Sequence, residues 1–414
     1  MVPRCPPKQP RLDAHCNLYT SVLTSTDLIA VVTAFQGGIF DDMRPFVRQA
    51  SYADWSEYFR YTSTHNVCWS DFTGIGDCLD SWLCSRSVDD VPLLVMHLPR
   101  LRDLLAMVAI QRASLSLVRA IDISRCQCLV IRAGVQQACR IGSVPLLKIV
   151  FPHHMLPWQY FDEECLVQGR SVDVVAYFSD IEAPIFSLQT MDSAASHNCL
   201  PIVEWLHLNR NEGCTTAAMD FAAANGHLEI VQFLHLHRPE GCTTFAMDRA
   251  AANGHLAVVQ FLHKHRTEGC TTSATDWAAL HGHLEVVQFL HEHRTEGCTL
   301  SALDVAAKNG HLEIVRFLHE HRTEGCSSDA MDGAAARGHL EIVRFLHEHR
   351  TEGCSSDAMD GAAARGHLEI VQFLHENRTE GCTTNAMARA GRSGHLEVVR
   401  WLNANRTEGC TQCD

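Results

Sequence analysis

The chain has 414 residues, of which 46% are hydrophobic and 20% are charged, and this composition is that of a folded protein and excludes a largely disordered one. Its formal net charge of −14 is concentrated in the second half, where residues 190–414 carry 18 Lys and Arg against 29 Asp and Glu. Because an acidic surface repels a phosphate backbone, we expect no nucleic-acid partner.

Residues 1–17, MVPRCPPKQPRLDAHCN, are predicted to be a flexible leader, since Pro and charged residues stand where a secretory signal has an apolar run. The longest apolar runs in the chain, such as DLIAVVTAF, are too short to span a membrane. We therefore expect no membrane partner and an intracellular location, in the cytoplasm with the nucleus left open. The 19 cysteines are then expected to be thiols.

Residues 18–95 are predicted to form a small N-terminal helical module. VLTSTDLIAVVTAFQGGIFDDMRPFVRQA has the pattern of two amphipathic helices around a turn at Gly37-Gly38. The favoured interpretation is a capping module for the helices that follow. The alternative is an adaptor module, because a Leu/Ile-rich helix after a short polar cap resembles the start of an F-box.

Residues 96–189 are predicted to be helical and to contain two decayed copies of a repeat. IGSVPLLKIV at residue 141 and GRSVDVVAYF at residue 169 align, 28 residues apart, with clearer copies downstream such as NGHLEIVQFL. The period therefore extends backwards into this segment.

Residues 190–414 contain eight clear copies of a 28-residue repeat, marked by two recurring tripeptides. Gly-His-Leu starts at Gly226, Gly254, Gly282, Gly310, Gly338, Gly366 and Gly394, and Glu-Gly-Cys ends at Cys214, Cys242, Cys270, Cys298, Cys326, Cys354, Cys382 and Cys410. Such a period predicts a solenoid in which each copy packs only on its neighbours.

Each copy is predicted to form two short helices. In the copy that begins at Thr271, a hydroxyl caps an Ala-rich first helix, and Gly282 marks the turn to the second. HLEVVQFLHEHR is amphipathic and forms the second helix, which Arg-Thr-Glu-Gly ends, with Gly297 in the left-handed conformation. Except for short turns, the fold class is therefore all-α.

The unit resembles an ankyrin repeat, because AANGHLEIVQFLH at residues 223–235 matches the second half of that family's pattern. It departs from the family where Thr-Pro-Leu-His is replaced by Ala-Met-Asp or a variant, and it is about five residues shorter than the family's 33. The resemblance covers about residues 130–414 and implies a solenoid of shortened ankyrin-like helix–turn–helix units. It implies an architecture and no particular activity.

The stretch FLHEHRTEGC at residues 289–298 has zinc-ligand residue types, yet metal binding is disfavoured. His291 and His293 point about 200° apart on a helix, and Asn replaces the second histidine in three copies. Equivalent cysteines of stacked helices lie about 8–10 Å apart, too far for a disulfide. With no nucleotide-binding loop, nucleophile elbow or zinc-protease motif in the sequence, we expect no enzyme activity, no cofactor and no small-molecule substrate.

The best candidates for a binding surface are two positions that vary between copies while the core residues stay constant. The resemblance to ankyrin repeats places both on the inner side of the first helices, which lines a concave face. Phe221, Phe245 and Trp277 with Arg249 are of the types that anchor protein interfaces; alternatively, the variation is that of a free solvent face, or Trp277 packs on a neighbouring helix. The predicted partner-binding residues are Phe221, Phe245, Arg249, Trp277, Ser273, Val305, Asp329, Asp357, Asn385 and Arg389.

The sequence thus predicts a non-enzymatic scaffold that binds a protein partner through the concave face of an ankyrin-type solenoid. The alternative is a ubiquitin-ligase substrate adaptor that uses the F-box-like segment to recruit the ligase.

Histidine content predicts a response to pH, because residues 190–414 hold 21 of the 26 histidines. Histidines in the last turn of the second helices are expected to take up protons readily, and those after the turn glycine, such as His283, to resist protonation. We predict a solubility minimum between about pH 5 and pH 6.5.

Overall fold

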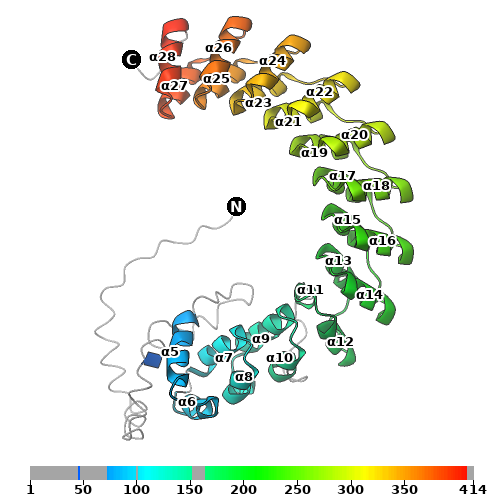
Figure 1. The fold of residues 1–414 in the computed structure, drawn as a ribbon, viewed down its shortest axis with the longest axis vertical. Coiled ribbons are helices and arrows are strands. Elements are labelled where there is room, and N and C mark those ends of the chain that lie inside the picture. The colour runs from blue at the N-terminus through cyan, green and yellow to red at the C-terminus, as the bar shows by residue number, and fades with distance from the viewer. Residues whose placement is uncertain (1–44, 47–71, 99–100, 152–163, 408–414) are drawn as a thin grey trace. The chain divides into compact units, whose positions relative to one another are not determined.

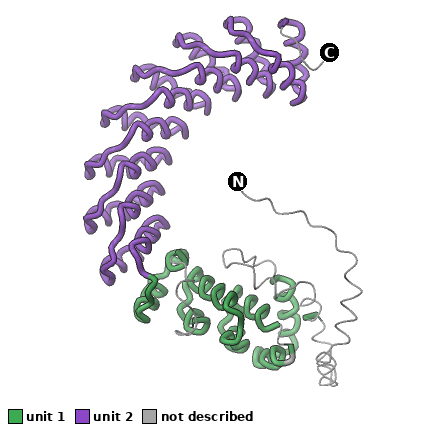
Figure 2. The backbone as a smooth tube through the Cα atoms, turned by 180° about the vertical axis from the view of Figure 1, so that it is seen from behind, with its two compact units in different colours: residues 1–185 green, residues 186–414 purple. Residues whose placement is uncertain are grey.

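The computed structural model describes residues 45–46, 72–98, 101–151 and 164–407, and within these residues the secondary structure is helical, with no strand. The chain divides into two compact units, Met1–Ile185 and Phe186–Asp414 (Figure 2). The second unit begins four residues before the predicted boundary at residue 190, because Ser187 caps its first helix.

The first unit is a set of short helices around a buried central one. The sequence of α7, RDLLAMVAIQ, is apolar on all sides, and Leu104–Ile110 are buried, as expected for a helix surrounded by others. Arg112, which follows α7, donates two hydrogen bonds of 2.6 and 2.7 Å to the carboxylate of Asp80 on α5. The helices are α5 (Thr73–Leu83), α6 (Val91–His97), α7 (Arg102–Gln111), α8 (Leu115–Ile121), α9 (Cys128–Arg140), α10 (Val144–Val150), α11 (Glu164–Gln168) and α12 (Val172–Asp180), with 3₁₀ turns at Val88–Asp90 and Ile123–Arg125.

The two decayed copies in this unit form the second helices of two helix pairs. Helix α10 follows Ser143, whose hydroxyl accepts from the N–H of Leu146, and α12 follows Ser171 with the same 28-residue spacing. Helix α9 packs on both α10 and α11. The weak period in this segment therefore marks helix pairs like those of the clear copies.

The second unit consists, in its described residues, of eight helix pairs (Figure 1). The first helices are α13 (Leu188–Ser196), α15 (Thr216–Ala224), α17 (Thr244–Ala252), α19 (Thr272–His281), α21 (Leu300–Asn309), α23 (Ser328–Arg337), α25 (Ser356–Ala364) and α27 (Thr384–Arg392). The second helices are α14 (Leu200–Asn209), α16 (Leu228–His237), α18 (Leu256–His265), α20 (Leu284–His293), α22 (Leu312–His321), α24 (Leu340–His349), α26 (Leu368–Asn377) and α28 (Leu396–Asn405).

The curvature of this unit follows from the size of the side chains between its helices. Buried alanines such as Ala246, Ala250 and Ala278 let neighbouring first helices approach closely. Neighbouring second helices are separated by larger side chains such as Phe289 and His263, whose rings lie between them. The first helices consequently lie on the inner side of the curve and the second helices on its outer side (Figure 1).

Helix ends in the repeat beginning at Thr271 follow the sequence prediction at one end and depart from it at the other. The Thr271 hydroxyl accepts from the N–H of Ser273 and caps α19, and Gly282 ends that helix with a φ of 85°. Helix α20 stops at His293, before the predicted end, and Arg294 has extended backbone. Gly297 does adopt the left-handed conformation, but it lies in the loop beyond the helix.

Candidate functional site

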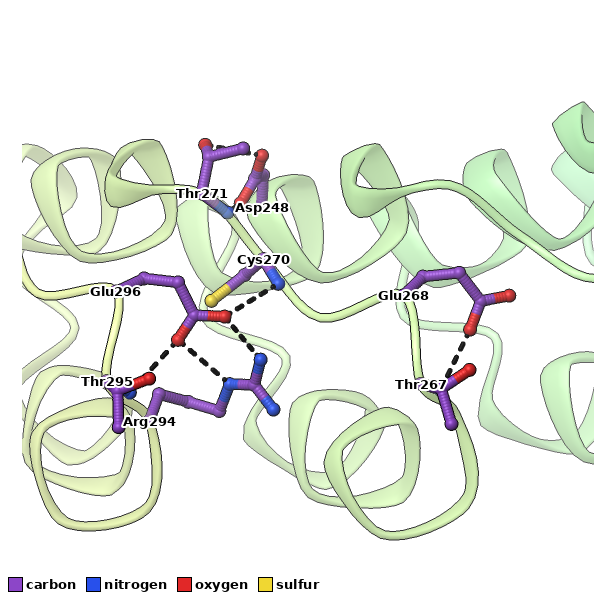
Figure 3. A network of polar contacts seen from close by, with 8 residues as sticks. All are labelled: Asp248, Thr267, Glu268, Cys270, Thr271, Arg294, Thr295 and Glu296. Carbon is purple, nitrogen blue, oxygen red and sulfur yellow. Dashed lines mark hydrogen bonds and ion pairs between the residues drawn. The ribbon is translucent and has the colours of Figure 1, made fainter.

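The Arg-Thr-Glu-Gly-Cys loop joins each repeat to the one before it (Figure 3). Arg294 binds the carboxylate of Glu296, with its Nε donating over 3.2 Å, and Glu296 also accepts from the backbone N–H of Cys270 in the preceding repeat. Burial opposes the charged form of Glu296, but these hydrogen bonds outweigh it and lower its pKa to about 2. Burial and the nearby Glu296 raise the pKa of the Cys270 thiol to about 12, so this cysteine is an unreactive core residue.

A second contact between repeats uses the Asp of the Met-Asp pair. Asp248 accepts from the backbone N–H and the hydroxyl of Thr271, over 2.7 and 2.8 Å, and so holds the residue that caps the next first helix (Figure 3). The same pair of bonds recurs for every Asp from Asp192 to Asp360. Ala388 replaces this Asp in the last repeat. The departure from the ankyrin Thr-Pro-Leu-His pattern therefore has a structural role that the sequence prediction missed.

A third contact explains the Gly-His pair at each turn. A Cβ on Gly254 would lie 2.6 Å from the His283 ring of the next repeat, and Gly254 has a φ of 77°, so only glycine fits. Burial, followed by the charge of His281, lowers the pKa of His283. The prediction that the turn histidines resist protonation is thus correct in direction for His283, although the main cause is burial.

The histidines of the second helices form a ladder with the phenylalanines on the outer side of the second unit. The His263 ring lies 5.5 Å from the rings of both Phe289 and His293 in the next repeat, and Phe289 and His293 stack at 4.4 Å. In the described part of the chain, no group of three or more His, Cys, Asp and Glu side chains could hold a metal ion. The ladder is an aromatic packing arrangement repeated along the unit.

In the second helices that carry two last-turn histidines, the first is predicted to take up a proton readily, and for three of them the structure indicates the opposite. Burial, followed by the charges of Arg294 and His293, lowers the pKa of His263, although Glu296 acts in the opposite direction. The pKa values of His235 and His319 are lowered for the same reasons. The prediction that last-turn histidines take up protons readily is therefore wrong for these three, because it considered the helix dipole and not the arginine of the next repeat.

Two columns of residues on the first helices take no part in these repeated contacts, and we call them the inner columns. The first column consists of Ala217, Phe245, Ser273, Ser301, Asp329, Asp357 and Asn385, and the second of Phe221, Arg249, Trp277, Val305, Gly333, Gly361 and Arg389. The two residues from each repeat are four positions apart and share one helix face. All ten predicted partner-binding residues belong to these columns.

Four residues of the inner columns form one contiguous cluster across α15, α17 and α19. The rings of Phe221 and Phe245 meet edge to face at 5.9 Å. The Arg249 guanidinium carbon lies 5.1 Å from the ring centre of Phe245 and 4.5 Å from that of Trp277. Phe221 is 45% exposed and Arg249 is exposed, whereas Phe245 and Trp277 are half-buried because Arg249 stacks between them. The stacking of Arg249 between the rings of Phe245 and Trp277 was not predicted from the sequence.

The other predicted residues continue the columns without joining this cluster. Ser273 and Val305 are half-buried, and Asp329, Asp357, Asn385 and Arg389 are exposed. Gly333 and Gly361 occur where a Cβ would lie 2.9 Å from the Cβ of Lys308 and 2.7 Å from that of Ala336. The first helices α21, α23 and α25 therefore approach one another closely at the two glycines.

A comparison with protein families agrees with this architecture. The family described as ankyrin repeats (3 copies) matches residues 191–276, 247–332, 275–360 and 331–412, which together span more than half of the chain. The chain belongs to the ankyrin-repeat family. No curated protein shows significant similarity to it. Its ankyrin repeats are short and joined by the Arg-Glu, Asp-Thr and Gly-His contacts described above.

Two further predictions concern parts of the chain outside the ankyrin repeats. The F-box-like segment falls mostly on residues 18–44 and 47–71, which lie outside the described residues, so the adaptor alternative stays a prediction, as does the flexible leader at residues 1–17. Among the helices of the described ranges, none combines the length and apolar character needed to cross a membrane.

Proposed function

We propose that the ankyrin repeats of residues 186–414 are a non-enzymatic scaffold that binds a protein partner on the inner columns. The observation that carries this proposal is the cluster of Phe221, Phe245, Arg249 and Trp277 on the inner side of the first helices. Aromatic and arginine side chains in contact with one another are typical of the residues that dominate binding energy at protein interfaces.

The cluster differs from the contacts that recur between repeats, and this difference supports a role in binding. The Arg294–Glu296 and Asp248–Thr271 contacts recur in nearly every copy and join groups of the solenoid to one another. Outside the cluster, the residues of the inner columns are Ala, Ser, Asp, Asn, Val, Gly or Arg, and the helices that carry them still stack. The cluster is therefore not required for stacking, and a role in binding accounts for three aromatic side chains and one cation at that place.

The electrostatic character of the repeats favours a protein partner over a nucleic acid. Residues 190–414 carry 18 basic against 29 acidic side chains, and an array with that balance repels a polyphosphate. A protein segment can instead place individual charges opposite individual residues of the inner columns.

Proximity labelling in the native cell with the full chain tests the proposal. We compare the wild type with Arg249→Ala/Trp277→Ala, and with Arg316→Ala/Arg344→Ala as the matched control. Arg316 and Arg344 lie on the second helices, where their guanidinium carbons are 5.9 Å from the Phe345 and Phe373 ring centres. We expect the inner pair of substitutions to remove a set of labelled proteins that the control retains. Identical sets from the two variants would contradict the proposal.

A further inference from the structure

We propose that the partner segment is dipolar, with acidic and apolar side chains opposite α15–α19 and basic side chains opposite α23 and α25. This inference rests on the proposed function and names the chemistry of the partner. The inner columns carry an aromatic and cationic half, made of Phe221, Phe245, Arg249 and Trp277, and an acidic half, made of Asp329 and Asp357.

The aromatic half presents a cation that forms no ion pair in the described part of the chain; the carboxylate of the neighbouring Asp248, which feels its charge, is held by Thr271. Each loop arginine of the second unit from Arg210 to Arg378 binds a glutamate two residues later, whereas Arg249 takes part in no ion pair among the described residues. Its guanidinium is stacked between the rings of Phe245 and Trp277. A guanidinium fixed in this way offers its N–H groups to a carboxylate, while the rings beside it suit apolar side chains.

The acidic half presents two carboxylates without a cation. Asp329 and Asp357 occupy the same column as Phe245, and both are exposed on the first turn of their helices. Their backbone N–H groups donate to Ser327 and Ser355, but no ion pair among the described residues involves their carboxylates. The neighbouring column has glycine at residues 333 and 361, so no side chain at those two positions can cover them.

The geometry of the solenoid gives the spacing of the charges in the partner. Three repeat steps separate α17 from α23, and stacked helices lie about 8–10 Å apart, so the two halves are about 24–30 Å apart. An extended chain covers that distance in about seven to nine residues, at about 3.3 Å per residue. Arg389 on α27 is exposed beyond the acidic half, which limits the basic part of the partner to α23 and α25.

Selection of phage-displayed random peptides of about 16 residues on the immobilised full chain tests this inference. We expect the enriched peptides to carry Asp or Glu beside an apolar residue, and Lys or Arg about seven to nine residues away. Arg249→Glu and Asp329→Lys/Asp357→Lys are each expected to weaken a selected peptide by about tenfold or more. Reversing the facing charge in the peptide is expected to restore binding to the corresponding variant.

Control variants and one further double substitution separate failure of the dipolar segment from failure of the proposed function. Arg316→Glu/Arg344→Glu reverses two charges on α22 and α24 at the outer side and is expected to leave peptide binding unchanged. Circular dichroism of every variant checks that the helices are retained. Peptides that bind the wild type but show no charge pattern and no response to the inner substitutions would overturn the dipolar segment while leaving the proposed function standing. Enriched peptides that bind Phe245→Ala/Trp277→Ala as well as the wild type would count against the proposed function itself.

Discussion

The inner and outer sides of the second unit carry similar chemistry in different arrangements. On the outer side, arginine lies over phenylalanine at Arg316–Phe345 and again at Arg344–Phe373, and histidine–phenylalanine contacts recur from repeat to repeat. On the inner side, Arg249 lies over Trp277, and the described residues do not repeat this stacking along the first helices. The contacts that recur along the stack stabilise it, whereas the inner contact is not needed for stacking and is available for the recognition that we propose.

The largest expected effect comes from a repeated contact. Asp248→Ala removes both acceptors of Thr271 and leaves a backbone N–H without its partner, so we expect the free energy of unfolding to fall by about 2–3 kcal/mol. Urea unfolding of the full chain, followed by circular dichroism, measures it. Asp329→Ala is the matched control, and its expected cost is below about 1 kcal/mol because it loses only an interaction with the helix dipole. Equal costs for the two variants would remove the distinction between repeated contacts and inner columns.

The next prediction compares an aromatic substitution on the inner side, which should affect binding, with one on the outer side, which should affect stability. Trp277→Ala is expected to weaken binding of a labelled partner or a selected peptide by about 2 kcal/mol, with helix content retained. Phe345→Ala on the outer side, where the ring contacts His319 and His349, is expected to lower the free energy of unfolding by about 2–3 kcal/mol and to leave affinity unchanged. Calorimetric titration and thermal unfolding measure both quantities. If Trp277→Ala unfolds its repeat, Trp277 is a core residue and the inner columns are wrongly assigned.

A smaller effect is expected at the loop contact. Glu296→Gln keeps the shape of the side chain but removes the negative charge to which both Arg294 and the Cys270 N–H donate, at an expected cost of about 1 kcal/mol. The lowered pKa of Glu296 gives the sign of its pH dependence: its contribution is complete above the unfolded value of 4.5 and is lost as the pH falls towards about 2. The free energies of unfolding of the wild type and of Glu296→Gln should therefore become equal as the pH falls. A constant difference from pH 7 to pH 3 would contradict this assignment.

The sequence predicted the parts of the structure that a single repeat encodes. A hydroxyl as the cap of the first helix and Gly282 as the turn follow from local patterns that the 28-residue period repeats in copy after copy. The Asp248–Thr271 bond joins two copies, and the only signal for it was the recurrence of Asp after Met in most copies. The stacking of Arg249 between Phe245 and Trp277 depends on distances between helices, which no periodicity supplies.

The smallest expected effect is the pH dependence of stability that the histidines on the outer side cause. The Nδ1 atom of His263 is buried without a hydrogen-bond partner, and the equivalent atom of His375 lies 3.3 Å from the Arg406 guanidinium. Protonation would place a positive charge beside the arginine of the next repeat. Because the pKa of His263 is lowered, the neutral form stabilises the fold, and this contribution is complete above the unfolded value of 6.5 and is lost as the pH falls below it.

We therefore expect the melting temperature of the second unit to decrease between pH 7.5 and about pH 5.5, and His263→Gln to make that decrease smaller, because an uncharged amide replaces the titrating ring. Gln260→Ala, at an exposed position of the same helix, is the matched control and should leave the slope as in the wild type. Lowered histidine pKa values also move the point of zero net charge of the repeats, and with it the predicted solubility minimum, towards lower pH. Differential scanning fluorimetry and light scattering on the same samples separate loss of the fold from association of folded chains. A melting temperature that rises on acidification would show that the charges of Glu296 and its equivalents, and not those of the arginines, dominate at the outer histidines.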